Sequence, residues 1–141
     1  MTAIAYRDGV LAADSMAVFN EHIKELNETK AVKEQGHLIA IAGENCPRND
    51  VFIKWYWGGR KKPLAKYKFD ALVVTPDGIA KCWDQTGEWQ PITGPYFAIG
   101  SGAETCMGAM HNGATAAAAV QAAIDHCPTV GGTVHSVKLG E

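Results

Sequence analysis

Residues 2–15 read TAIAYRDGVLAADS. Two β-prone runs, residues 2–7 and 10–15, flank the dipeptide Asp8-Gly9, which is among the strongest short-range signals for a tight hairpin turn. The stretch therefore predicts that the fold opens with an antiparallel hairpin.

The rest of the chain continues with hairpins and helices, and residues 16–28 are predicted to be polar and irregular. Strands are predicted at 29–33, 37–42, 71–75, 79–83, 89–92, 96–99 and 133–139, and helices from Pro47 to Gly58, over 103–111 and over 114–127. Many antiparallel strands with helices grouped between them favour an α+β fold in which two sheets lie between helix layers. The 141 residues fit one domain, 1–141, and no repeat or linker divides them.

Composition excludes several classes of protein. The net charge of −2 gives no overall electrostatic surface for nucleic acid. Residues 60–68 are locally basic, and a solvated loop is the commoner reading of such a run than a polyanion site. No stretch reaches the ~18 apolar residues that a membrane span needs. No interaction with nucleic acid or with a membrane is therefore expected.

The cysteines and histidines predict no metal site. The four cysteines show no CxxC or other metal spacing, and none of the five histidines has a carboxylate or thiol at ligand spacing. No cofactor is expected either. Because the start of the chain does not resemble a signal peptide, a cytoplasmic location with free thiols is the expectation.

Four blocks of sequence, taken together, resemble proteasome β-type subunits and the peptidase subunit of the bacterial two-component ATP-dependent protease. They are residues 2–15, residues 29–32 (TKAV) with 38–43 (LIAIAG), residues 97–102 (FAIGSG) and residues 130–134 (VGGTV). The blocks occur in the order of that family. The resemblance implies a four-layer αββα sandwich of the N-terminal nucleophile hydrolase type, here with trimmed helices. It also implies assembly into a homo-oligomer, a ring or a related form.

The resemblance makes Thr2 the nucleophile once Met1 has been removed. A threonine hydroxyl needs a base, and a free α-amine on the same residue can serve as one. An unperturbed α-amine has a pKa of ~7.8, so only about 15% is neutral at pH 7, and lowering that pKa by about one unit makes the neutral form the majority. Lys30 is predicted to supply the neighbouring positive charge, with Asp14 orienting it. Lys33 is the weaker candidate because it lies at the turn.

Further residues are assigned supporting roles by the same resemblance. Ser101 is predicted to hydrogen-bond the amine, although it could instead cap the helix that follows it. The backbone N–H of Gly43, at a predicted strand-to-helix turn, would stabilise the oxyanion. Ser15 is predicted to support the site. An acidic residue that the family holds before its Gly-Gly pair aligns with Cys127, and Asp125, two residues earlier, is the candidate replacement.

Three functions remain open from the sequence. The first is a threonine-type hydrolase that cleaves peptide or protein substrates, with or without an ATPase partner, which the sequence does not identify. The second is a catalytically silent, proteasome-like scaffold or binding protein. The third is an amidase for a small molecule, which would share the nucleophile and differ in its pocket.

Overall fold

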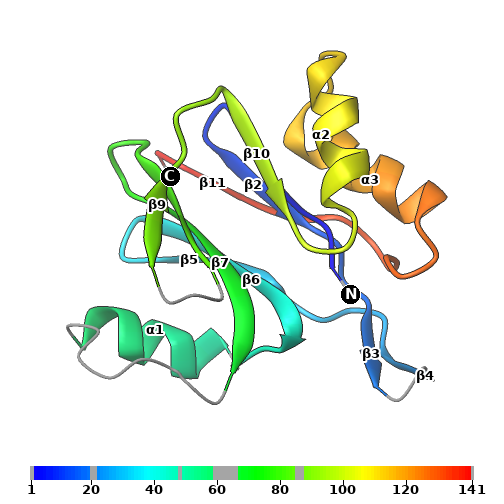
Figure 1. The fold of residues 1–141 in the computed structure, drawn as a ribbon, viewed down its shortest axis with the longest axis horizontal. Helices are drawn as coiled ribbons and strands as arrows, with labels where there is room; N and C mark the ends of the chain where they lie inside the picture. The colour runs from blue at the N-terminus through cyan, green and yellow to red at the C-terminus, as the bar shows by residue number, and fades with distance from the viewer. Residues whose placement is uncertain (1, 20–21, 48, 59–66, 85–87, 141) are drawn as a thin grey trace.

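The computed structural model describes residues 2–19, 22–47, 49–58, 67–84 and 88–140. Within these ranges two antiparallel sheets face each other, and three helices cover their outer faces (Figure 1). The order of the layers is helices, sheet, sheet, helix. The mixed α+β class and the layering agree with the prediction from sequence.

The first sheet carries the start of the chain. Its strands, in order across the sheet, are β10 (Tyr96–Ile99), β1 (Ile4–Arg7), β2 (Val10–Ala13) and β11 (His135–Lys138). Asp8 and Gly9 connect β1 to β2 with positive φ angles of 51° and 78°, as a two-residue hairpin turn requires. In the register Ile4 pairs with both Ala13 and Ile99, so the beginning of β1 lies between the ends of β2 and β10.

The second sheet has five strands in sequence order. They are β5 (Ala31–Glu34), β6 (His37–Asn45), β7 (Lys68–Val74), β8 (Ala80–Trp83) and β9 (Trp89–Pro91). Their alternate side chains separate two cores. Leu38 and Leu72 join Ile4 and Leu11 of the first sheet in a core between the sheets, in which all four are fully buried. Each such side chain contributes roughly 1.5–3 kcal/mol to folding.

The helices cover the outer faces. Helix α1 (Asn49–Trp57) lays Phe52 and Tyr56, one turn apart, on the second sheet. Helices α2 (Ala103–His111) and α3 (Ala116–His126) lie on the first sheet through a core rich in alanine. The hydroxyl of Thr115 caps α3 by accepting from the Ala118 N–H at 3.1 Å. Small side chains on both surfaces allow these helices to approach the sheet closely.

Two predictions about local structure were wrong. Residues 16–28 are not irregular, because β3 (Ala17–Phe19) and β4 (His22–Glu25) form a two-stranded ribbon. Strands this short, with a register shift between Ala17 and Val18, leave too little alternation to detect. The chain also does not turn at Gly43: β6 continues to Asn45 through a bulge, and α1 starts at Asn49.

Other predictions can be set against the described residues more briefly. Most of the basic run lies outside them, since residues 59–66 are not described. All four cysteines are free, and burial raises the pKa of the Cys46 and Cys82 thiols to about 11 and that of Cys106 to about 12. In the described part of the chain, no helix has both the length and the apolar character needed to cross a bilayer.

Candidate active site

The first hairpin brings Thr2 and Asp14 to one end of the first sheet. The hairpin ladder extends beyond β1 and β2, because the Asp14 N–H donates to the Ala3 carbonyl at 3.1 Å. In return, the Ala3 N–H donates to Asp14 Oδ1 at 3.0 Å. The Asp14 side chain is fully buried, and Thr2 is only 7% exposed. A carboxylate and a hydroxyl are thus held inside the protein at the open end of the hairpin.

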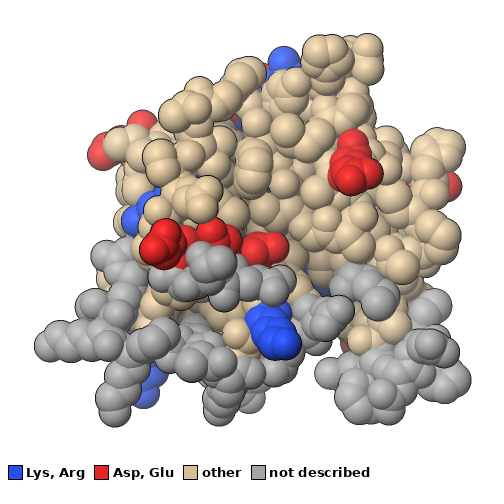
Figure 2. Space-filling view, in the orientation of Figure 1, with Lys and Arg blue, Asp and Glu red and all other residues tan. Residues whose placement is uncertain are grey.

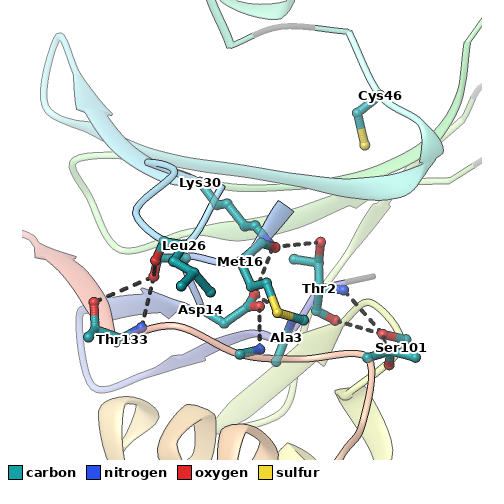
Figure 3. A network of polar contacts seen from close by, with 12 residues as sticks. Thr2, Ala3, Asp14, Met16, Leu26, Lys30, Cys46, Ser101 and Thr133 are labelled. Atoms are coloured by element: carbon teal, nitrogen blue, oxygen red, sulfur yellow. Dashed lines mark hydrogen bonds and ion pairs between the residues drawn. The ribbon is translucent and has the colours of Figure 1, made fainter. Parts of the chain in front are cut away.

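Lys30 places its ammonium between these two groups (Figure 3). Its Nζ donates to Thr2 Oγ1 at 3.3 Å, to Asp14 Oδ1 at 3.0 Å and to the Met16 carbonyl at 2.6 Å. Three acceptors match the three N–H donors of an ammonium. Lys30 lies just before β5 of the second sheet, so the ion pair joins the two sheets.

Asp14 is surrounded by donors. Besides Lys30 and the Ala3 N–H, the Gly131 N–H donates to Asp14 Oδ2 at 3.2 Å. A buried charge without partners would cost several kcal/mol, whereas one with an opposite charge and hydrogen bonds on both oxygens is tolerated. The donors come from three segments that are distant in sequence, so the carboxylate fixes their relative positions.

Ser101 lies at the other side of Thr2. The Thr2 N–H donates to Ser101 Oγ at 3.1 Å, and the Gly102 N–H donates to the Thr2 carbonyl at 3.1 Å. Ser101 Oγ also lies 3.1 Å from Thr129 Oγ1. The alternative role of Ser101 as a helix cap is not observed, because the N-cap of α2 is Gly102 and no side chain caps it. The Ser101 hydroxyl is directed at the nitrogen of Thr2.

Ser15 is buried directly behind the cluster. Its Oγ donates to the Leu26 carbonyl at 2.6 Å and accepts from the Thr133 N–H at 2.8 Å. Gly132, with φ of 80°, lies so close that a Cβ atom there would collide with Ser15 Oγ. Ser15 therefore holds the segment that leads to β11 against the end of β2.

Gly43 lies in the bulge of β6. A Cβ atom at this position would be 2.6 Å from Phe69 Cα and would also collide with the Lys68 carbonyl oxygen, so only glycine fits. The Cys46 thiol lies 3.4 Å from the Gly43 carbonyl oxygen, as a donor. Burial is the main cause that raises the pKa of the Cys46 thiol, and the positive charge of Lys30 acts to lower that pKa. Cys46, which follows the bulge, is therefore close enough to Lys30 for the lysine charge to act on its thiol.

Asp125 is not brought to this cluster. It is exposed on α3, and its Oδ1 accepts from Gln121 Nε2 at 2.9 Å, one helical turn away. The group that meets Ser101 is instead the hydroxyl of Thr129. Lys33 lies within β5 opposite Leu38, half-buried, and it is Lys30 whose ammonium reaches Thr2.

Several members of the cluster had no role in the sequence-based prediction. Met16 and Gly131 act through backbone atoms, whose directions do not follow from residue type. Gly131 was noticed only as half of a glycine pair. A close approach explains it, because a Cβ atom there would lie 2.7 Å from Met16 Sδ. Thr129 gave no signal at all.

Solved structures of Thiobacillus denitrificans BPH share this fold. BPH in complex with epoxomicin has a TM-score of 0.71 and 17% sequence identity, with 99% of each chain covered. A second structure, Thiobacillus denitrificans BPH, has a TM-score of 0.67 at 17% identity and covers 99% of this chain and 98% of the other. No protein-family model matches the sequence, and no curated protein matches it significantly. At this level of identity the likeness concerns the fold alone.

Proposed function

We propose that the protein is a threonine-type N-terminal nucleophile hydrolase that cleaves peptide bonds after Met1 has been removed. One observation carries the proposal: both reactive atoms of Thr2 have a dedicated partner. Lys30 Nζ lies 3.3 Å from Thr2 Oγ1, and Ser101 Oγ lies 3.1 Å from the Thr2 nitrogen. A threonine that served packing alone would not need a buried ammonium at its hydroxyl.

The solved structures add support from another direction. Thiobacillus denitrificans BPH, which shares the fold along nearly the whole chain, has been solved in complex with epoxomicin. Epoxomicin is an inhibitor of threonine proteases. A proteasome-like fold that holds such an inhibitor makes hydrolysis by a threonine the first function to test for this chain.

The acylation step uses Thr2 as both nucleophile and base. The neutral α-amine takes the proton of Thr2 Oγ1, directly or through a water, as Oγ1 forms a bond to the carbonyl carbon of the substrate. The carbonyl oxygen becomes an oxyanion. The ammonium formed on Thr2 then returns its proton to the leaving nitrogen as the carbon–nitrogen bond breaks. An ester on Thr2 and a free amine product result.

Deacylation repeats the proton transfers with water. The Thr2 amine removes a proton from water as the water oxygen bonds to the ester carbon. The bond from that carbon to Oγ1 then breaks, Oγ1 takes the proton back from the ammonium, and the acid product is released. In both steps Lys30 stabilises negative charge that develops on Oγ1 and favours the neutral form of the amine, because two positive charges repel each other. Ser101 fixes the direction of the amine. Gly43 is the proposed oxyanion donor through its backbone N–H.

A peptide epoxyketone tests the proposal. Protein that begins at Thr2 should gain the mass of the probe on residue 2, and Thr2→Ala should abolish labelling while the circular dichroism spectrum is unchanged. Thr2→Ser should retain labelling, because serine keeps both a hydroxyl and an α-amine. Labelling that survives in Thr2→Ala would refute the assignment.

The same experiment separates the other two functions. Folded protein that begins at Thr2 but neither reacts with the probe nor cleaves any peptide would be a scaffold. Protein that reacts and cleaves small acyl amides, while leaving extended peptides intact, would be a small-molecule amidase. Hydrolysis of a fluorogenic peptide with loss in Thr2→Ala supports the proposal.

A further inference from the structure

A pocket of about 690 Å³ runs along β10, and Gly100, which follows that strand, is part of its lining. One wall is the strand itself, from Tyr96 to Gly100, and the opposite wall includes Asp70 and Asp84 of the second sheet. Among the lining residues, Gly100 is the one that lies next to Thr2 in space. Gly100 lies so close to Thr2 that a Cβ atom on it would collide with the Thr2 carbonyl oxygen.

The wall formed by β10 has an open backbone edge. Among the strands that the structure describes, β10 pairs with β1 alone and ends the order of the first sheet. Figure 1 shows it at the margin of that sheet, above β9 of the other. A strand bonded on one side only turns alternate N–H and C=O groups outward, and an extended peptide can pair with such an edge.

The opposite wall is acidic. Asp70 has the same parity along β7 as Leu72, which is buried in the core between the sheets, so its carboxylate faces the first sheet. Asp84 follows β8 and accepts from Gln90 Nε2 at 2.8 Å. Figure 2 shows Asp and Glu side chains in a row across this face, in the region that β7 and β9 occupy in Figure 1.

The carboxylate of Asp70 is the acidic group in this wall that favours a bound cation. It is half-buried, and no described residue donates a hydrogen bond to its carboxylate. Burial raises its pKa, and the neighbouring charge of Asp84 raises it further. Burial raises the pKa of the Cys82 thiol, with further contributions from both carboxylates. Asp70 and Asp84 therefore repel each other, and a cation bound beside them would offset that repulsion.

We propose that this groove binds the substrate as an extended peptide that pairs with β10 and places a lysine or arginine side chain at Asp70 and Asp84. The inference rests on the proposed function, since it assigns a substrate class to the same nucleophile.

Binding is tested first, without cleavage. Fluorescence anisotropy on Thr2→Ala compares two octapeptides. In the first, one arginine is the only charged side chain. In the second, citrulline, which has nearly the same shape and no charge, replaces that arginine. We expect the arginine peptide to bind at least tenfold more tightly at low salt. Asp70→Asn should abolish this preference. Asp77→Asn removes the same charge from the exposed β7–β8 turn and should leave the preference unchanged.

Hydrolysis is then tested on protein that begins at Thr2. The arginine peptide should have a kcat/KM at least tenfold above that of the citrulline peptide, Asp70→Asn should remove the difference, and Asp77→Asn should keep it. Equal affinity for both peptides overturns the inference. So does a preference for the arginine peptide that survives both in Asp70→Asn and in the double variant Asp70→Asn/Asp84→Asn.

The two proposals fail in different ways. A charge preference in the binding assay without hydrolysis supports the groove and refutes the enzyme. Hydrolysis without a charge preference supports the enzyme and refutes the groove. Hydrogen exchange decides whether the groove is open: β10 amides that become protected only when peptide is added support the inference, and amides already protected without peptide show that another part of the assembly fills it, which overturns it.

Discussion

Lys30→Met should abolish most of the activity, whereas Lys33→Met should not. Methionine keeps the length and apolar stem of the lysine side chain but removes the ammonium. Lys30 Nζ contacts Thr2 Oγ1, Asp14 and the Met16 carbonyl, while Lys33 is half-buried in β5. Only Lys30→Met removes a positive charge that lies next to Thr2 Oγ1.

The magnitude follows from the distance. At an effective dielectric constant of about 20, a full negative charge 3.3 Å from an ammonium is stabilised by roughly 5 kcal/mol. If about half a charge develops on Oγ1 in the transition state, the loss is roughly 2.5 kcal/mol, or about 70-fold in rate. The amine also loses the cation that favours its neutral form, so we expect a decrease of a hundredfold or more.

Stability must be measured beside activity. Removing one partner of a buried ion pair costs about 3–5 kcal/mol, because the other charge is left in the interior. The total stability of a domain is only about 5–15 kcal/mol. The double variant Asp14→Asn/Lys30→Met removes both charges and should recover part of the loss in chemical denaturation, yet it should remain inactive.

Initial rates on a fluorogenic peptide, divided by the folded fraction from near-UV circular dichroism, give the comparison. Lys33→Met should stay within a fewfold of the unchanged protein. A folded Lys30→Met protein that keeps more than a tenth of the activity would refute the assignment. So would a larger effect from Lys33→Met.

Three further outcomes are expected. Protein that begins at Thr2 should hydrolyse peptide, and protein that retains Met1 or carries an N-terminal tag should not, because the nitrogen of Thr2 is then an amide without a basic lone pair; mass spectrometry of the N-terminus establishes the form, and equal rates would exclude the mechanism. Thr129→Val should slow turnover about fivefold, the value of one hydrogen bond, because Ser101 Oγ loses its 3.1 Å partner. Thr129→Ser should restore the rate, and equal rates for the two variants would remove Thr129 from the site. In solution the protein should sediment as a homo-oligomer, and a mass of 15.1 kDa at micromolar concentration would contradict this.

The sequence was most informative where turn chemistry is strict. Asp8-Gly9 predicted the first hairpin because few residues other than Gly, Asn or Asp adopt its positive φ angles readily. The dipeptide Asn112-Gly113 predicted a break between two helices, and α2 and α3 are separate in the structure. The β3–β4 ribbon and the bulge in β6 were missed for different reasons. The strands of the ribbon are too short to show alternation, and the bulge depends on pairing with β7, which a short window of sequence does not contain.

The candidate site was predictable as a set of side chains and not as a network. Thr2, Asp14, Lys30 and Ser101 came from the resemblance, since periodicity alone gives no reason to bring them together. The contacts of Met16 and Gly131 are made by backbone atoms, so residue type carries no information about them. Asp125 shows the limit of proximity in sequence, because it lies on α3 whereas Cys127, two residues later, follows the end of that helix with an extended backbone.

The Asp14–Gly131 contact has a consequence for synthesis. The two residues are 117 positions apart, and Thr2 and Ser101 are 99 apart. Chains are made at about 5–20 residues per second, so roughly 6 to 23 s separate the synthesis of Asp14 from that of Gly131. During this interval the start of the chain exists without the segments that bury Thr2 in the folded protein. Met1 can therefore be removed before Thr2 is buried, and the proposed site is not complete before synthesis is nearly finished.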